Sequence, residues 1–363
     1  MMKKKPIIAI DLSSTGAGGG PYTSNMSVMN SGLKEKYEFV PFIYKTEMGR
    51  FISIKRIIDL KKQLVKIKPD LVHFSGLQLM GFHIAIACKL AKVKSTVVTV
   101  HGLTSDALNL NWLKKSFLTF LLEPLTILLS SKAYGVSEYV SKRSMLNIFK
   151  WKNYGFIYNM PPIPIKNSSD YSIRKELEID TKAKIAISVG RIITDKGYHI
   201  LDEAILKFKG YNDIKFIIVG DGDYIEFMKI KLQSQVEKKQ VFFLGYRNDI
   251  QQILSGCDFF VLPTLHETLS IALLEASLEG LALIASNTGG VPEIVENNYN
   301  GILVEPGNVN QLYVAINKLY KQSDLCSSYG ANAKEKLRIK FDSSKIQEKI
   351  DQIYKSVLNE VKL

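Results

Sequence analysis

Short, β-branched runs recur along the whole chain, and helix-length segments separate them. In the first half, the expected strands are residues 7–11, 38–43, 70–74, 96–100 and 156–159. In the second half they are residues 184–189, 215–219, 241–244, 259–262 and 281–285. Runs that are apolar nearly throughout are typical of parallel strands covered on both faces. The alternation therefore predicts an α/β fold with two doubly wound parallel sheets.

The Pro-rich segment 161–164 separates the two halves. We expect an N-terminal domain at residues 1–162 and a second domain at 163–342. Residues 343–363 form a terminal helix near the first domain in this interpretation, because apolar residues recur there at helical spacing. Open α/β sheets bind ligands at the carboxyl ends of their strands, so two such domains predict a site in a cleft between them.

Composition excludes several classes of protein. With 46% hydrophobic and 23% charged residues among 363, the chain is neither disordered nor built of many membrane spans. Three widely spaced cysteines exclude a disulfide framework and fit a reducing compartment. The apolar run at residues 7–10 is too short for a signal peptide, and the stretch 117–129 is too short to span a bilayer. We therefore expect a cytoplasmic protein.

The positive charge lies in one half. Residues 1–165 carry 23 Lys and Arg against 9 Asp and Glu, whereas residues 166–363 carry 25 against 26. This asymmetry predicts an anionic partner for the first half, such as phospholipid, a phosphorylated substrate or nucleic acid. The alternative is a generally basic protein without such a partner.

Two glutamates follow the expected strand at 259–262. Glu267 lies in a strand-to-helix loop, and Glu275 lies in the first turns of a helix that begins near Ser270. The free N–H groups of a helix start suit a diphosphate, and carboxylates accept hydrogen bonds from sugar hydroxyls. The alternative is that Thr264 and Glu267 form a capping box and that Glu275 is a solvated helix residue.

Other segments accompany these glutamates. Gly190, Arg191 and Lys196 follow the first strand of the second half, where two cations can clamp a diphosphate. Further motifs are Thr288-Gly-Gly-Val-Pro-Glu293, Asn300-Gly301 and Val219-Gly-Asp-Gly222. Together these segments resemble the retaining glycosyltransferases of family 4, also called glycosyl transferases group 1, which have the GT-B architecture of two Rossmann-like domains.

The resemblance assigns roles residue by residue. It implies that Arg191 and Lys196 bind the diphosphate of a nucleotide sugar, that Glu275 holds the ribose and that Glu267 contacts the transferred sugar. Amides around Leu269, Ser270 and Ile271 would meet the phosphates and the sugar. The sequence departs from the family's usual Glu-Gly-Phe-Gly, since it reads Glu267-Thr-Leu-Ser270, and the usual Asn-Gly is Asn159-Met160.

The first half offers two candidate sites. A glycine loop that includes Gly18, Gly19 and Gly20 could bring backbone N–H groups to a phosphate or an acceptor; Pro21 excludes the GxGxxG pattern of a dinucleotide site. The alternative is a flexible surface loop. His101 follows an expected strand, and the resemblance places a histidine there against the donor sugar; the alternative is a capped loop histidine.

We expect no metal and no cofactor other than the nucleotide sugar. Asp221-Gly-Asp223 is formally a DxD metal motif, but two cations already serve the diphosphate. The segments 50–66 and 112–120 combine apolar residues with lysines and are candidates for an anionic membrane surface; the alternative is that both are ordinary helices packed on the sheet. No motif that reads nucleic acid is present in the sequence.

The sequence thus predicts a metal-independent, retaining hexosyltransferase. Its acceptor would be a saccharide, or a lipid-linked saccharide of bacterial surface polysaccharide synthesis at the inner face of the plasma membrane. The alternatives are a nucleotide-sugar epimerase or phosphorylase of the same fold, and a non-catalytic basic module that binds membrane or nucleic acid.

Overall fold

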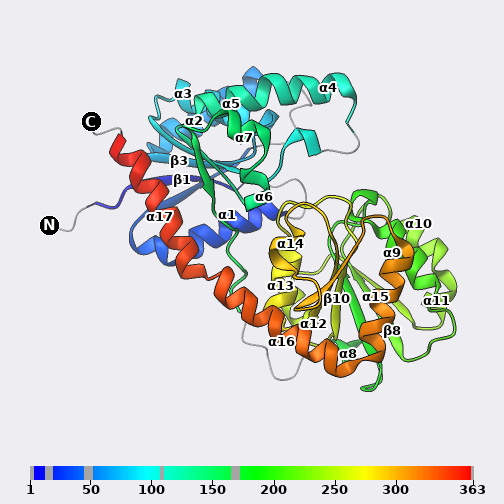
Figure 1. Cartoon of the computed structure of the whole chain (residues 1–363). Coiled ribbons are helices and arrows are strands. Elements are labelled where there is room, and N and C mark those ends of the chain that lie inside the picture. Colours follow the sequence, from blue (N-terminus) through cyan, green and yellow to red (C-terminus); the bar gives the residue numbers. More distant parts are fainter. Residues whose placement is uncertain (1–3, 13–18, 45–51, 107–109, 165–171, 361–363) are drawn as a thin grey trace. The chain divides into compact units, whose positions relative to one another are not determined.

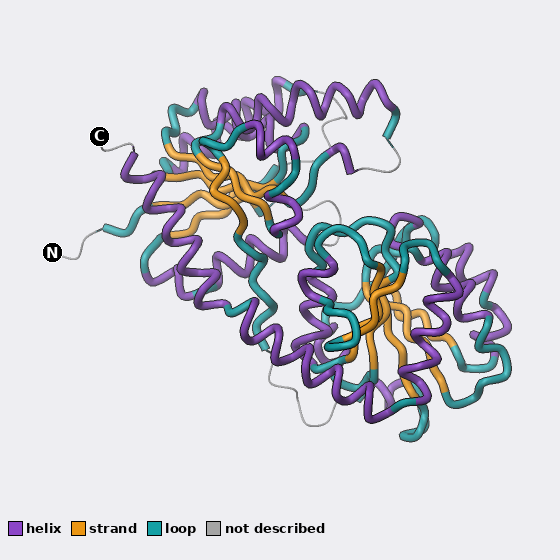
Figure 2. Tube along the Cα trace, in the orientation of Figure 1, coloured by secondary structure: helices purple, strands orange, loops and turns teal. Residues whose placement is uncertain are grey.

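The computed structural model describes residues 4–12, 19–44, 52–106, 110–164 and 172–360. The chain divides into two compact units, one of residues 1–160 with 343–363 and one of residues 161–342. The division at 160/161 lies two residues before the boundary expected from the sequence. Each unit is a parallel sheet with helices on both faces (Figure 2).

The first unit contains six parallel strands in the order β2-β1-β3-β4-β5-β6. The strands are β1 Ile7–Asp11, β2 Glu38–Phe42, β3 Leu71–Ser75, β4 Ser95–Val100, β5 Lys132–Gly135 and β6 Asn153–Phe156. The helices are α1 Gly20–Asn30, α2 Ile54–Ile67, α3 Leu79–Leu90, α4 Trp112–Phe117, α5 Glu123–Leu129, α6 Glu138–Ser141, α7 Ser144–Ile148 and α17 Ser343–Glu360, with a π-helical turn at Leu118–Leu122 and 3₁₀ turns at Gly32–Glu35 and Thr104–Asp106. In Figure 1, α1 and α17 lie on one side of this sheet, and α3 and α5 lie on the other.

The terminal helix α17 completes the core of the first unit. Its apolar side is buried together with residues of β1, β3 and α1. Polar contacts fix its register: Tyr37 donates to Asp351 at 2.7 Å, and the hydroxyl of Tyr354 lies 2.6 Å from Nδ1 of His73. The C-terminal helix therefore belongs to the first unit, although the whole second unit separates it from the rest of that unit in the sequence.

The second unit contains six parallel strands in the order β12-β11-β10-β7-β8-β9. The strands are β7 Lys184–Val189, β8 Ile214–Val219, β9 Val241–Gly245, β10 Phe259–Leu262, β11 Ala282–Ser286 and β12 Gly301–Val304. The helices are α8 Ile173–Glu176, α9 Tyr198–Leu206, α10 Ile225–Lys231, α11 Gln233–Glu237, α12 Ile250–Leu254, α13 Ile271–Glu279, α14 Val291–Ile294, α15 Val309–Lys321 and α16 Ser323–Lys340, with a 3₁₀ turn at Thr194–Lys196. Helices α9 and α15 share one core cluster with the strands (Figure 1).

The structure confirms the doubly wound α/β prediction and corrects its strand count. Each sheet has six strands rather than the five expected. The strands missing from the prediction are β5 and β12, which have only four residues each and contain glycine, so their sequences carry little strand signal. The last strand of the first sheet is Asn153–Phe156 rather than residues 156–159. Its pairing is set by β5, where Ala133 faces Asn153 and Gly135 faces Phe156.

Within the described residues, no helix combines the length and the apolar composition that crossing a bilayer requires.

Candidate functional site

The turns after β7 and β8 touch each other through their backbones. The N–H of Gly190 donates to the carbonyl of Val219 at 3.0 Å, and the N–H of Ile192 donates to the carbonyl of Asp221 at 2.9 Å. Gly220 has a φ of +131°, and a Cβ there would lie 1.9 Å from the carbonyl oxygen of Gly190. Glycine is required because a side chain would separate the two turns. This contact fixes the backbone that carries Arg191.

An ion pair joins two of the predicted residues. Nζ of Lys196 lies 2.7 Å from Oε2 of Glu267, and both side chains are largely buried. The two loops come this close because Gly197, with a φ of +75°, has no side chain; a Cβ there would lie 1.8 Å from the carbonyl oxygen of Pro263. A cation and a carboxylate that are 71 residues apart in the sequence therefore lie next to each other at the carboxyl edge of the sheet.

Hydrogen bonds fix both the side chain and the backbone of Glu267. Its Oε1 accepts from the N–H of Thr268 at 3.1 Å, and its carbonyl oxygen accepts from the N–H of Gly290 at 3.0 Å. The second contact joins the loop after β10 to the Thr288-Gly-Gly290 turn after β11. The motifs that are separate in the sequence thus form one connected edge.

Helix α13 begins where the sequence predicts. Ser270 is its N-cap, and its Oγ accepts from the N–H of Leu273 at 3.3 Å. Leu269 and Ser270 are buried, and Ile271 is half-buried. The capping-box alternative is wrong, because the hydroxyl of Thr264 donates to the carbonyl of His266 at 2.8 Å instead. Glu267 is therefore not used to cap this helix.

Glu275 lies one turn inside α13 and is half-buried. In the described part of the chain, its carboxyl group has no hydrogen-bond or ion-pair partner. Burial raises the pKa of this carboxyl group to about 7. A dehydrated carboxylate without a partner gains most from hydroxyl donors that a ligand brings. Arg191 is exposed, and its guanidinium likewise has no side-chain partner among the described residues.

In the first unit, His101 follows β4 and is half-buried. Its Nε2 lies 3.3 Å from Oγ of Ser75, and Nδ2 of Asn25 donates to the same hydroxyl at 3.1 Å. Burial lowers the pKa of His101 to about 4, so the imidazole is neutral near pH 7. The residues that orient His101 were missed from the sequence; a polar residue at the end of β3 was the available signal for Ser75.

A buried carboxylate holds the loop that follows His101. Oε1 of Glu123 accepts from both the N–H and the hydroxyl of Thr104 at 2.7 Å, and from Nε2 of Gln78 at 3.1 Å. Glu123 has no exposed surface. This role could not be predicted from the sequence, because a glutamate in an apolar stretch is equally consistent with an exposed residue.

The glycine loop is described only in part. Gly19 is the N-cap of α1 and Gly20 is the first residue of that helix, while Gly18 lies outside the described residues. A Cβ on Gly19 would meet nothing within 4 Å. Packing of the described residues therefore does not require glycine at position 19, and a ligand role for this loop stays a prediction.

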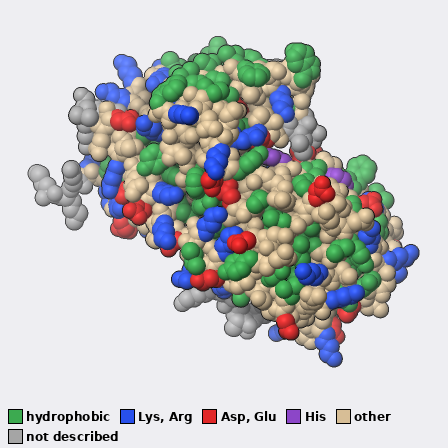
Figure 3. Space-filling view, in the orientation of Figure 1, with side chains coloured by type: hydrophobic (Ala, Val, Ile, Leu, Met, Phe, Trp, Pro, Cys, Tyr) green, Lys and Arg blue, Asp and Glu red, His purple; other side chains and the backbone are tan. Residues whose placement is uncertain are grey.

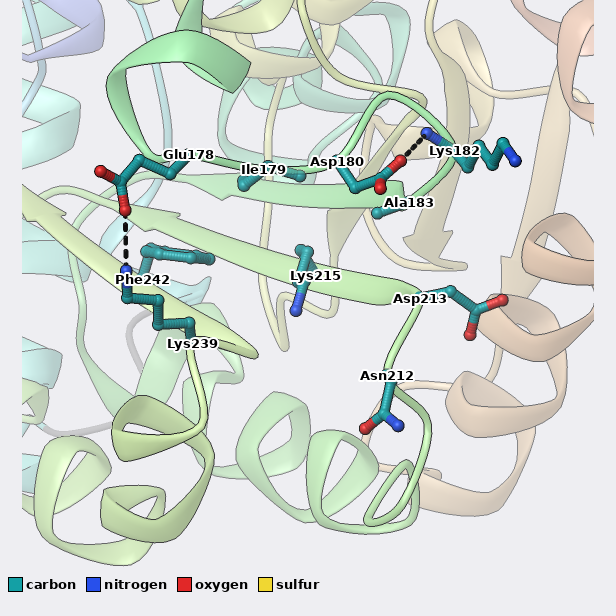
Figure 4. A pocket seen from close by; sticks show the side chains of 10 residues that line it. All are labelled: Glu178, Ile179, Asp180, Lys182, Ala183, Asn212, Asp213, Lys215, Lys239 and Phe242. Carbon is teal, nitrogen blue, oxygen red and sulfur yellow. Dashed lines mark hydrogen bonds and ion pairs between the residues drawn. The ribbon is translucent and has the colours of Figure 1, made fainter.

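One pocket of the second unit lies away from these residues. It is lined by Glu178, Ile179, Asp180, Lys182, Ala183, Asn212, Asp213, Lys215, Lys239 and Phe242 (Figure 4). These residues precede or begin β7, β8 and β9, so the pocket lies at the amino-terminal ends of the strands. Ligands of open α/β sheets bind at the opposite ends, where the predicted residues of this unit are found.

Comparison with known proteins bears on this arrangement. Residues 170–336 match the family described as glycosyl transferases group 1, and residues 23–132 match the family described as glycosyl transferase 4-like. The chain belongs to the group 1 glycosyltransferases. Arg191, Lys196, Glu267 and Glu275 fall within the first match, and His101 falls within the second.

Two curated relatives of this glycosyltransferase cover most of its length. A UDP-Gal:alpha-D-GlcNAc-diphosphoundecaprenol alpha-1,3-galactosyltransferase of Escherichia coli is 29% identical, over 87% of this chain and 82% of the relative. An N,N'-diacetylbacillosaminyl-diphospho-undecaprenol alpha-1,3-N-acetylgalactosaminyltransferase of Campylobacter jejuni is 25% identical, over 90% and 86%. The family supports a transferase rather than a non-catalytic basic module.

Solved structures show the same fold. Anabaena HepE, solved in complex with UDP and glucose, aligns with a TM-score of 0.77 at 20% identity and covers 97% of this chain and 100% of its own. The sucrose-phosphate synthase of Thermosynechococcus elongatus aligns with the same TM-score at 18% identity, over 98% and 100%. The glycosyltransferase described here therefore has the GT-B fold that its sequence motifs predict.

The DxD alternative gains no support in the described residues. Among them, no group of three or more His, Cys, Asp and Glu is arranged to hold a metal ion. Oδ1 of Asp221 accepts from the N–H of Gly222 at 2.8 Å, and both Asp221 and Asp223 are exposed. A reaction without metal stays a prediction, as does the absence of any cofactor.

Proposed function

We propose that this protein transfers a sugar from a nucleotide diphosphate sugar to an acceptor hydroxyl with retention of anomeric configuration. The observation that carries the proposal is the edge built by Lys196, Glu267 and the start of α13, with Glu275 one turn further. This edge combines a cation, free helix N–H groups and two carboxylates, which are the groups that a nucleotide sugar requires. UDP in the HepE structure and UDP-Gal in the name of the E. coli relative support a nucleotide donor.

Each residue has a chemical role in this proposal. Arg191 and Lys196 stabilise the charge that develops on the departing diphosphate, together with amides near Leu269, Ser270 and Ile271. Gly190 keeps side chains away from this backbone. Glu275 accepts hydrogen bonds from the ribose hydroxyls, and Glu267 accepts them from the sugar while it orients Lys196.

The acceptor is a saccharide on a lipid diphosphate in this proposal. Two relatives named above act on diphosphoundecaprenol-linked sugars, by their names. The excess of 23 cations over 9 acids in residues 1–165 suits such a phosphorylated acceptor. His101 would contact the sugar, and the loop with Gly19 and Gly20 would serve the acceptor. The reaction would then belong to polysaccharide synthesis at the inner face of the plasma membrane.

The resemblance to the retaining glycosyltransferases of family 4 supports retention, and the residue inventory argues against a covalent sugar–enzyme intermediate. Oε2 of Glu267 is already ion-paired with Lys196, and Glu275 is assigned to the ribose, so neither is a free nucleophile. In the proposed step, the bond between the anomeric carbon and the phosphate oxygen breaks while the acceptor oxygen bonds to the same face. The proton of the acceptor hydroxyl passes to the departing phosphate oxygen. Positioning and charge stabilisation then carry the catalysis.

A panel of nucleotide sugars with lipid-linked and soluble saccharide acceptors tests the proposal. We expect release of nucleoside diphosphate with formation of a glycoside, and activity that survives EDTA. Proton NMR of the first-formed product should show the donor's anomeric configuration. An inverted product, or a covalent sugar adduct on Glu267 or His101, would refute the mechanism; products of epimerisation or phosphorolysis would replace the function.

A further inference from the structure

One apolar surface of the first unit faces away from its core. Helix α4, the π turn and α5 form one continuous helical run from Trp112 to Leu129. Large apolar side chains are exposed along it, here called the apolar ridge: Trp112, Leu113, Phe117, Phe120, Leu121 and Leu128. Trp112 is 72% exposed and Phe120 is 78% exposed. Figure 3 shows hydrophobic side chains gathered over α4 and α5 at the top of the view.

The ridge is not needed to attach this helix to the unit. The inward side of the run already packs, since Leu118 and Leu122 are buried in a cluster with Phe82 of α3. Ile127 is also fully buried. Trp112 and Phe120 are not part of this buried cluster. Contiguous exposed apolar residues of this size typically mark an interaction surface.

The charge around the ridge is positive. Lys114 and Lys115 lie between Trp112 and Phe117, and residues 112–122 contain no acidic residue. The next acid in the sequence, Glu123, has no exposed surface. Tryptophan beside lysine on an apolar helix is the composition of segments that lie in the interface of an anionic bilayer.

We propose that the apolar ridge docks the protein on an anionic lipid bilayer. Trp112 would lie at the level of the headgroups, Phe117, Phe120 and Leu121 would enter the acyl boundary, and Lys114 and Lys115 would meet lipid phosphates. The choice of a bilayer over a protein partner rests in part on the proposed lipid-linked acceptor. Docking would bring the enzyme to the surface that holds this substrate.

The second candidate from the sequence, α2, has a lesser role. Its inward residues Ile57, Leu60 and Leu64 are buried, which supports a helix packed on the rest of the unit. Ile54, Ile58 and Val65 are exposed, but charged residues alternate with them and no aromatic residue is present in the helix. We expect α2 to add electrostatic attraction without insertion.

The first experiment uses vesicle co-sedimentation with phosphatidylcholine alone and with added phosphatidylglycerol. Trp112→Ser/Phe120→Ser should weaken binding to the anionic vesicles about tenfold or more, since two large side chains lose their burial. Phe227→Ser/Ile230→Ser is the matched control, because both residues are exposed on α10 of the second unit. Lys61→Glu/Lys62→Glu on α2 should have a smaller effect than Lys114→Glu/Lys115→Glu. Equal binding of the ridge variant and the control would overturn the proposal.

Fluorescence locates the contact directly, because the chain has two tryptophans. In Trp151→Phe, the remaining Trp112 should show a blue shift on anionic vesicles. In Trp112→Phe, the remaining Trp151 should show none. A shift in the second variant alone would overturn the assignment to the ridge. Loss of a dimer in light scattering of the ridge variant, with wild type unable to bind vesicles, would identify a second copy as the occupant instead.

Activity separates this inference from the proposed function. The ridge variant should keep its rate with a short-chain, water-soluble acceptor and lose it with an acceptor embedded in vesicles. No transfer to any acceptor, together with ridge-dependent vesicle binding, would refute the function and leave the docking surface. Equal rates on both acceptors, with binding unchanged, would refute the docking surface alone. Thermal unfolding of each variant shows that it is folded.

Discussion

The carboxyl edges of the two sheets are built differently, although each sheet has six parallel strands. In the second unit, glycine turns bring charged groups together, and the Lys196–Glu267 ion pair lies among them. In the first unit, His101 belongs to a neutral hydrogen-bonded chain that runs from Asn25 through Ser75. A cluster of fixed charges suits a diphosphate, whereas a chain of neutral polar side chains suits uncharged hydroxyls. Substitutions in these two groups of residues are therefore expected to affect activity by different amounts.

The largest expected effect is on the charged edge. Arg191→Ala or Lys196→Ala should each lower turnover by about 10²-fold or more, the size of effect for losing one electrostatic stabiliser. Lys207→Ala is the control, because this exposed lysine of the same unit bonds to Asn310 away from the edge. Only Lys196→Ala should also lower the melting temperature, since it leaves Glu267 without its ion-pair partner. Unchanged turnover in both variants would remove the two cations from the mechanism.

Next in size is the effect on nucleotide binding. Glu275→Ala should weaken binding of nucleoside diphosphate by about 1–3 kcal/mol through the loss of charged hydrogen bonds. Because the pKa of this carboxyl group is about 7, wild-type affinity should rise between pH 6 and pH 8 as the carboxylate forms. Calorimetry should show a smaller rise for Glu275→Gln. Glu279→Ala, one turn along α13, should bind like wild type, and equal affinity in Glu275→Ala would defeat the ribose assignment.

Substitutions in the neutral chain around His101 should act more weakly. His101→Ala should lower kcat/KM by about two- to tenfold, as expected for the loss of one hydrogen bond between neutral groups. NMR titration should give His101 a pKa near 4, so kcat/KM should show no step from this residue near its ordinary pKa of 6.5. Ser75→Ala should change kcat/KM in the same direction and by less. A step near pH 6.5 that disappears in His101→Ala would show that the histidine titrates during catalysis.

The last expected effect concerns stability without ligand. The pKa of Glu275 is raised from 4.5 to about 7 by folding, so the protonated form is favoured in the folded state, and the stability it provides is lost as pH rises from 4.5 to about 7. Glu275→Gln removes this loss. Its melting temperature should equal that of wild type near pH 4 and exceed it near pH 8. The same difference at both pH values would show that Glu275 is not buried as a carboxylate.

The sequence alone predicted the fold class, a division near residues 161–164 and the charged residues that follow strands of the second unit. These follow from local patterns: strand-length apolar runs, a proline-rich segment, and motifs that lie directly after strands. Lys196 and Glu267 could be named because each lies in a loop after a recognisable strand, and Glu275 because it lies in the first turns of the helix after Glu267. The strand at Lys132–Gly135 could not be predicted, because four residues with a lysine and a glycine form a strand only when their neighbours pair with them.

Tertiary structure alone decided which polar groups form hydrogen bonds with each other and which apolar side chains stay exposed. Ser270 rather than Thr264 caps α13, Ser75 meets His101, and Glu123 holds Thr104, each through contacts between distant segments. The raised pKa of Glu275 also depends on burial that no local pattern encodes. The helices at Ile54–Ile67 and Trp112–Leu129 look alike in sequence as apolar segments with lysines. Only packing decides that the first buries Ile57, Leu60 and Leu64 and that the second leaves its aromatic residues exposed, because burial is set by the neighbours that a helix meets.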